Sequence, residues 1–162
     1  MTDSLPTGRF SGPAAFEQLV RDALAQAARE GWPEIILSDA SFEDWPLRER
    51  SVVASLQAWS RPGRHLILLA TRYDKLLRAH PRFVSWRKTW GHLIDCRQCT
   101  EVAPANFPSA ILSRDWFVHR KDPSRSSGAC GQDRASWVRL KEMLDERILE
   151  SVPGFPSSTL GL

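Results

Sequence analysis

Four polar residues follow segments that we expect to be strands, at positions where ligand-binding side chains are common. Ligands of open parallel sheets bind beyond the carboxyl ends of the strands, so the first polar residues after each strand are natural candidates. Two carboxylates facing two guanidiniums could orient a polar or phosphorylated ligand, because arginine offers a planar fork of donors to oxyanions. The ligand-binding residues predicted in this way are Asp39, Arg72, Asp74 and Arg97.

The carboxylates among these residues also have an ordinary structural interpretation. Asp74 and the nearby Asp44 stand where helix N-caps are expected. Asp39 suits the turn that follows a strand. Both interpretations stay open at the level of the sequence.

Cys96 and Cys99 form a Cys-x-x-Cys pair, which could share one tetrahedral metal ion. A structural zinc site needs two further ligands, and the chain offers Cys130 as its third thiol, with His92 and His119 as the nearest imidazoles. A redox pair would begin a helix after a strand, whereas this pair ends an expected strand. We therefore predict ordinary reduced thiols and no metal, with a Cys3His site as the alternative.

The chain contains none of the short motifs that mark common catalytic centres. G-x-S-x-G, H-E-x-x-H and the glycine-rich P-loop are all absent. We therefore predict no catalytic residue and no cofactor, and favour a binding function over an enzymatic one.

Positive charge is concentrated in the middle of the sequence. The 162 residues carry 22 basic and 19 acidic side chains, a net charge of +3. Residues 1–50 hold five basic and nine acidic residues, residues 51–100 hold nine and two, and residues 101–162 hold eight of each. The basic segment 61–97 could attract nucleic acid or phosphate, and a solvated helix face explains it equally well. Its helical part contains Arg72, Lys75, Arg78, Arg82, Arg87 and Lys88.

Seven tryptophans could provide stacking surfaces for single-stranded nucleic acid. Four of them fall on the apolar faces of expected helices, which favours packing in the core instead. These four are Trp59, Trp86, Trp90 and Trp137.

The spacing of apolar residues predicts the elements that position these side chains. Apolar residues at helical spacing predict helices over 14–30, 45–60, 73–91 with a break at Pro81, and 133–150. Short apolar runs predict strands over 33–38, 65–70, 92–96, 109–112 and 116–119, the last two forming a hairpin. This order predicts a single α/β domain over residues 14–150, with a flexible leader at 1–13 and a tail at 151–162. The expected sheet is largely parallel and flanked by helices, with a short C-terminal strand pair and a final helix.

The order of these elements resembles one half of a protein of the phospholipase D-like superfamily. The segments that carry the resemblance are 35–39, 65–70 and 109–115. The chemistry of that superfamily depends on His-x-Lys-x4-Asp. Aligning Asp115 with the aspartate puts Pro108 and Ala110 at the other two positions, and aligning His119 and Lys121 puts Ser126 at the aspartate position. The resemblance therefore implies a half-domain without the complete catalytic motif.

Three functions follow as hypotheses. The first is a non-catalytic domain that binds a partner protein or a small polar or phosphorylated ligand at the strand-end crevice. The second is a binder of nucleic acid or phosphate that uses the basic segment 61–97. The third is a noncanonical phosphodiester-processing enzyme that uses His119 and Lys121. These two residues are predicted to bind ligand together with Asp39, Arg72, Asp74 and Arg97.

The expected location is the cytoplasm, with no membrane partner. No segment approaches the roughly 20 apolar residues of a membrane span, and residues 1–10 lack the basic start and apolar core of a signal peptide. A homodimer is compatible with the sequence.

Overall fold

Two apolar strands, β2 (Glu34–Ser38) and β3 (His65–Ala70), lie near the centre of an eight-stranded sheet in the computed structural model, which describes residues 4–155. The order of strands across the sheet is β1-β7-β6-β5-β2-β3-β4-β8. Beyond β2 and β3, the sheet consists of β1 (Gly8–Phe10), β4 (Ile94–Gln98), β5 (Ala110–Leu112), β6 (Phe117–Asp122), β7 (Ser127–Gly131) and β8 (Val152–Pro153).

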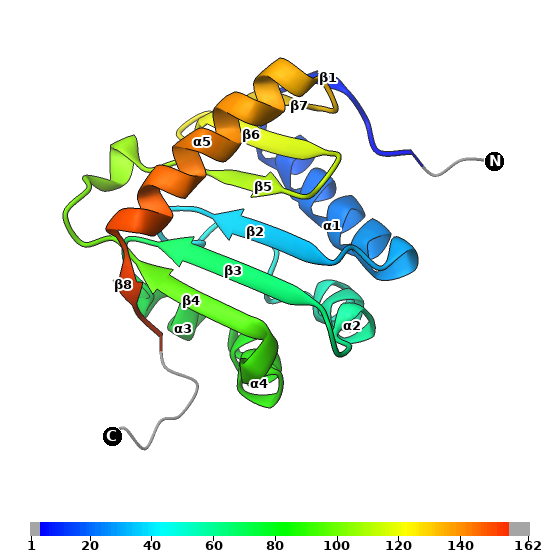
Figure 1. The fold of residues 1–162 in the computed structure, drawn as a ribbon, viewed down its shortest axis with the longest axis vertical. Coiled ribbons are helices and arrows are strands. Elements are labelled where there is room, and N and C mark those ends of the chain that lie inside the picture. Colours follow the sequence, from blue (N-terminus) through cyan, green and yellow to red (C-terminus); the bar gives the residue numbers. More distant parts are fainter. Residues whose placement is uncertain (1–3, 156–162) are drawn as a thin grey trace.

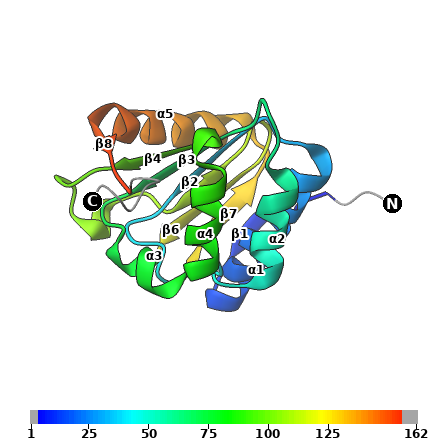
Figure 2. The same cartoon turned by 90° about the horizontal axis from the view of Figure 1, so that it is seen from below.

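Five α-helices cover the sheet. They are α1 (Pro13–Glu30), α2 (Arg50–Trp59), α3 (Asp74–Ala79), α4 (Pro81–Thr89) and α5 (Arg134–Glu150). Helices α1 to α4 lie on one face of the sheet and α5 crosses the other (Figures 1 and 2). Two short 3-10 helices, Gly91–Leu93 and Pro104–Asn106, precede and follow β4.

Local sequence explains where the long helices begin and end. Pro13 opens α1 in the first turn, where a missing N–H costs nothing, and Gly31 ends it in the left-handed conformation with its N–H on the Ala27 carbonyl. The side chain of Asp133 accepts a hydrogen bond from the backbone N–H of Ser136 and caps α5. Pro81 separates α3 from α4, as predicted.

Alternation along the strands divides the core into two layers. On β2, Ile35 and Leu37 face α1 to α4, and Ile36 faces α5. The larger layer is rich in aromatic residues, and Phe16, Trp45 and Trp59 are among its fully buried side chains. Burial on both faces is the reason that β2 and β3 read as continuous apolar runs in the sequence.

The prediction of a largely parallel sheet is wrong. Only β2–β3 and β3–β4 are parallel, and the other five pairings are antiparallel. The two parallel pairs are the ones that helices connect, in the βαβ units that the sequence predicted. Short turns join β5, β6 and β7, which forces antiparallel pairing, and segments close to both ends of the chain add antiparallel edge strands. The fold is therefore a mixed, mostly antiparallel sheet.

Several short elements differ from the predicted ones. Strand β1 forms within the expected leader, β7 within residues 122–132, for which no helix or strand was predicted, and β8 within the expected tail. Residues 156–162 of that tail lie outside the described part. Helix α2 begins at Arg50 rather than near residue 45, because Trp45 and Leu47 are buried in the core from a turn. In the described part of the chain, no helix is long and apolar enough to cross a membrane.

Candidate functional site

A buried arginine occupies the crevice at the carboxyl end of β2. Arg120 of β6 is only 2% exposed, and its Nη2 donates to Asp39 Oδ1 at 2.9 Å. Its Nη1 donates to Asp44 Oδ2 at 2.7 Å and its Nη2 to Asp44 Oδ1 at 3.1 Å. The serine hydroxyls of Ser109 and Ser126 accept from Nε and Nη1, at 3.0 and 3.1 Å.

Neighbouring residues fix this network from both sides. The guanidinium carbon of Arg120 lies 4.1 Å from the ring centre of Phe16 on α1. Asp39 Oδ2 accepts hydrogen bonds from the backbone N–H groups of Ser41 and Phe42, and Phe42 adopts a positive φ of 60°. Burial lowers the pKa of Arg120, but hydrogen bonding to Asp44 and the charge of Asp39 outweigh it, so the pKa is raised overall.

The crevice therefore presents acceptors rather than donors. A cavity of about 230 Å³ opens here beside Asp39, Glu43, Asp44 and Arg120. All five N–H groups of Arg120 point to protein acceptors, so none is left to hold an oxyanion. The side chain of Asp44 is 55% exposed and that of Glu43 is 60% exposed. A phosphorylated ligand would meet these carboxylates first.

The other residues predicted from the strand ends do not join this crevice. Arg72 is exposed, and Asp74 pairs along α3 with Arg78 at 3.6 Å. Arg97 turns toward the end of α5, where its Nε donates to Ser151 Oγ at 2.9 Å and its Nη2 to the Ser151 carbonyl at 3.0 Å. Of the predicted set, only Asp39 lies at the buried ion network.

His119 and Lys121 do not line the crevice at Asp39. Side chains alternate along the first part of β6, so Val118 and Arg120 face α1, whereas His119 faces the α5 side. Lys121 is exposed and lies where the register between β6 and β7 shifts. Burial, together with the charge of Lys121, lowers the pKa of His119. These two residues do not converge with Asp39 in one cleft.

The cysteines are separated by the sheet. Cys96 and Cys99 stand three residues apart on extended chain, which directs them to opposite faces, and they belong to different core layers. Cys130 lies in the layer of Cys96, where its thiol faces the Pro6 carbonyl. Burial raises the pKa of all three thiols, that of Cys96 to about 11. A Cys-x-x-Cys ion site would require both thiols on one face.

Part of the basic segment is committed to internal contacts. Arg87 is buried, donating from Nε to Cys96 Sγ at 2.9 Å and from Nη2 to the Phe155 carbonyl at 2.7 Å. Lys75 pairs with Glu43 at 3.3 Å. Sequence alone counts both residues as free surface charge, but Arg87 is buried, and Lys75, although exposed, is paired with a carboxylate.

Two exposed arginines, Arg50 and Arg82, line a groove between α2 and α4. The two helices run side by side in the same direction. At one end, Arg82 donates to the carbonyl of Arg48 at 3.0 Å, and at the other, the Trp90 indole donates to Gln57 Oε1 at 3.2 Å. The groove has a volume of about 450 Å³. It is lined by Arg50, Val53, Ala54 and Gln57 from α2 and by Arg82, Ser85, Trp86 and Thr89 from α4.

Positive charge in this groove has no local compensation. Neither α2 nor α4 contains an aspartate or glutamate. Among the described residues, Arg48, Arg50 and Arg82 form no ion pair with a carboxylate, and the nearest acidic residue in sequence, Glu49, pairs with Arg21 at 2.7 Å. We name Arg48, Arg50 and Arg82 the arginine cluster.

Comparison with known proteins identifies a fold relationship. No family model and no curated protein matches the chain. A similar solved structure is that of TrmBL2, described as an archaeal chromatin protein with a novel mode of DNA binding, with a TM-score of 0.63 and 13% identity. The match covers 91% of this chain and 54% of that one, so the chain spans about half the length of TrmBL2.

This relationship corrects the resemblance proposed from the sequence. The chain resembles part of TrmBL2 in fold rather than a phospholipase D-like protein. The order of elements was not specific enough to identify the fold, because βαβ units followed by a hairpin occur in many mixed sheets.

Proposed function

We propose that this protein binds nucleic acid through the phosphate backbone, using the arginine cluster at the α2–α4 groove. The observation that carries the proposal is the combination of three exposed arginines with two adjacent helices that lack any carboxylate. Phosphate contacts from arginine supply most of the affinity in sequence-independent binding.

The helix ends reinforce the arginines. Helices α2 and α4 begin beside the cluster, and neither has a side-chain cap on its first N–H groups. The positive ends of both helix dipoles and their free N–H groups favour an anion at the same place. The Ser85 hydroxyl on α4 adds a neutral donor suited to phosphate or sugar oxygens, whereas the Thr89 hydroxyl already donates to the Ser85 carbonyl at 3.2 Å.

Two further considerations favour this function over ligand binding at the crevice. Arg120 has no free donor there, and the outer carboxylates repel anions. TrmBL2 is described as a DNA-binding protein, which makes duplex DNA the first nucleic acid to test.

The test is fluorescence anisotropy with a labelled DNA duplex of unrelated sequence, repeated with a single strand, over a series of salt concentrations. We expect binding that weakens with salt, and a slope of log affinity against log salt that falls by about two in an Arg50→Gln/Arg82→Gln variant. Arg139→Gln is the matched control, because Arg139 is an exposed arginine on α5 at the other face of the sheet.

Two outcomes would contradict the proposal. One is the absence of binding by the unmodified protein at low salt. The other is an equal loss of affinity in the control, which would mean that only overall charge matters.

A further inference from the structure

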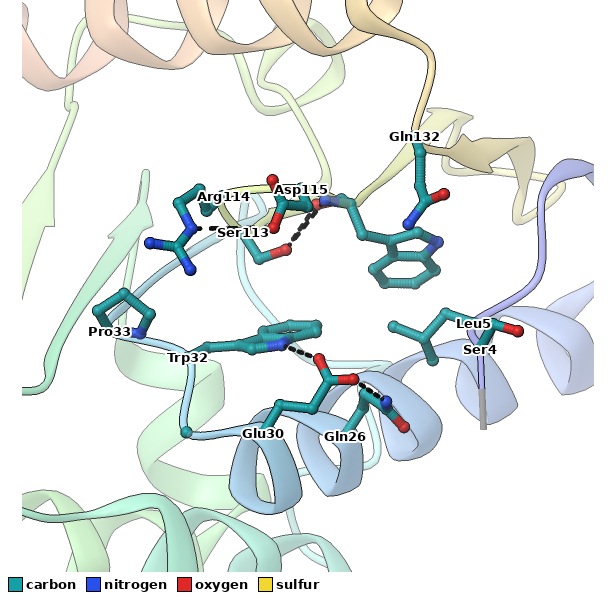
Figure 3. A pocket seen from close by; sticks show the side chains of 12 residues that line it. Ser4, Leu5, Gln26, Glu30, Trp32, Pro33, Ser113, Arg114, Asp115 and Gln132 are labelled. Carbon is teal, nitrogen blue, oxygen red and sulfur yellow. Dashed lines mark hydrogen bonds and ion pairs between the residues drawn. The ribbon is translucent and has the colours of Figure 1, made fainter. Parts of the chain in front are cut away.

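A second cavity lies at the opposite end of β2 from Asp39, and it is walled by aromatic and acidic side chains. Its volume is about 320 Å³. One wall consists of Gln26 and Glu30 at the end of α1 with Trp32, and the opposite wall comes from Ser113, Arg114 and Asp115 of the β5–β6 turn (Figure 3). The rest of the lining consists of Ser4, Leu5, Gly31, Pro33, Trp116 and Gln132.

Both tryptophans are held in place by their indole nitrogens. The Trp32 indole donates to Glu30 Oε1 at 2.8 Å, and the Trp116 indole donates to the Pro6 carbonyl at 3.0 Å. Neither N–H is therefore available to a ligand. Trp116 is only 2% exposed, so the aromatic surface that the cavity offers is mainly that of the half-buried Trp32. The π-surface of tryptophan attracts cations more strongly than that of the other aromatic residues.

The side chains that line the cavity carry two negative charges and one positive charge. Glu30 and Asp115 oppose Arg114, whose guanidinium lies 3.8 Å from the Asp115 carboxylate. The C-terminus of α1 adds the negative end of its dipole beside Glu30.

Hydrogen bonding narrows the kind of cation. Each oxygen of Glu30 already accepts a hydrogen bond, one from Trp32 and the other from Gln26. Glu30 thus offers negative charge more than free acceptor positions, which suits a cation that carries few donors. An alkylated ammonium group has this property and is typically recognised by aromatic side chains. The cavity volume is near the lower end of the roughly 300–1,000 Å³ of small-molecule sites, which suits a compact ligand.

We propose that this cavity binds a small organic cation with an alkylated ammonium group, with Trp32 contacting its methyl groups and Glu30 supplying the opposite charge. The site is separate from the α2–α4 groove and does not depend on nucleic-acid binding.

The test is isothermal titration calorimetry of the whole protein with choline and with 3,3-dimethyl-1-butanol, its neutral isostere. We expect choline to bind, and the isostere to bind about tenfold more weakly or not at all. Glu30→Gln keeps an acceptor for the Trp32 indole but removes the charge, and should weaken choline binding by about tenfold. Trp32→Leu should weaken it at least as much.

Arg114→Gln distinguishes a cation site from an anion site, because removing this positive charge should strengthen choline binding. Thermal unfolding of each variant monitors folding, and if Trp32→Leu does not fold, Glu30→Gln decides alone. Absence of choline binding at millimolar concentration, equal binding of the isostere, or unchanged affinity in Glu30→Gln would overturn the proposal.

Discussion

Arg120 illustrates how a single residue can organise the end of a sheet. Its burial would cost several kcal/mol if the charge were unpaired, but two carboxylates and two hydroxyls surround it. Through Asp39 it also holds the turn at Ser41 and Phe42, which leads the chain toward α2. The network is therefore a structural junction between β2, β6 and the segment before α2.

Replacing Arg120 by methionine should strongly destabilise the protein. The change leaves Asp39 buried without its partner, for which a loss of about 3–5 kcal/mol in the free energy of unfolding is expected. Urea denaturation measures this loss. Arg125→Met is the control, since that side chain is 83% exposed and only distantly paired, and it should change stability little.

Adding Asp39→Asn and Asp44→Asn to Arg120→Met should restore part of the lost stability, because the uncompensated negative charges disappear. A loss below about 1 kcal/mol for Arg120→Met alone would contradict the structural role of the network.

We expect His80 to make the protein less stable in mild acid. Burial lowers the pKa of His80, whose Nε2 lies 2.7 Å from the Phe42 carbonyl. The unfolded chain, with a pKa of about 6.5, binds a proton more readily than the folded chain does. The free energy of unfolding should therefore fall as the pH drops through about 6.5 toward the lower folded-state value.

Denaturation at a series of pH values between about 5 and 8 measures this dependence. His80→Gln should flatten the curve, and the slope that is left should come from His119, whose pKa is also lowered. An unchanged slope in His80→Gln would show that His80 does not contribute.

The sequence predicted helices and strands best where an apolar pattern continues over many residues. The long helices α1 and α5, and the apolar strands β2 and β3, lie within a residue or two of their predicted positions. Strands β1 and β8 were missed because each is short and pairs with residues distant in sequence. Strand β7 pairs with the adjacent β6, but its sequence, Ser-Gly-Ala-Cys-Gly, consists mostly of residues that are uncommon in strands. The sheet was predicted to be largely parallel because these antiparallel pairings were not recognised.

Contacts between residues distant in sequence were also missed at the candidate sites. Asp39 was predicted from its position after β2, but its partner Arg120 lies 81 residues away, between His119 and Lys121 on β6. These polar neighbours hide its burial, and only its alternation with Val118 along the strand could have placed Arg120 on the core face. The basic segment 61–97 was recognised, yet Arg48 and Arg50 lie outside it and join Arg82 only because α2 packs beside α4.

The pairing of β6 with β7 depends on Gly128. A Cβ atom at this position would lie 2.0 Å from the His119 carbonyl oxygen and 2.9 Å from the Arg120 Cα, both of them backbone atoms. The register shifts in this region, between His119 and Asp122. Gly128→Ala should cost about 1–3 kcal/mol in unfolding free energy, because the backbone must move apart.

Chemical denaturation measures this cost, and Ala129→Ser on the same strand is a suitable control. Since the neighbouring Arg120 is buried, Gly128→Ala should also weaken its ion network. If the alanine variant were as stable as the unmodified protein, the backbone at the register shift between His119 and Asp122 would be able to move apart at no cost.

Seen as a whole, the molecule has two different helical faces. The face with α2 and α4 combines the arginine cluster with two helices that lack carboxylates, whereas α5 carries four basic and four acidic residues. The modest net charge of +3 therefore conceals a directional field.

Hydrogen exchange should reveal this asymmetry. When DNA is added at low salt, the amides of α2 and α4 should exchange more slowly, because bound phosphates cover the groove. The amides of α5 should be unaffected, and they serve as the internal control. Equal protection of both faces would argue against a defined binding surface.

The short edge strands affect how the protein behaves in a crowded solution. Strand β1 has three residues and β8 has two, and β8 contains Pro153, which has no N–H to offer a neighbouring chain. Next to β8, the partly exposed Asp95 places a charge on β4. Such short, charged or proline-containing edges resist the strand addition that begins aggregation. Copies of this chain that do associate are therefore expected to meet through a helical face rather than by extending the sheet.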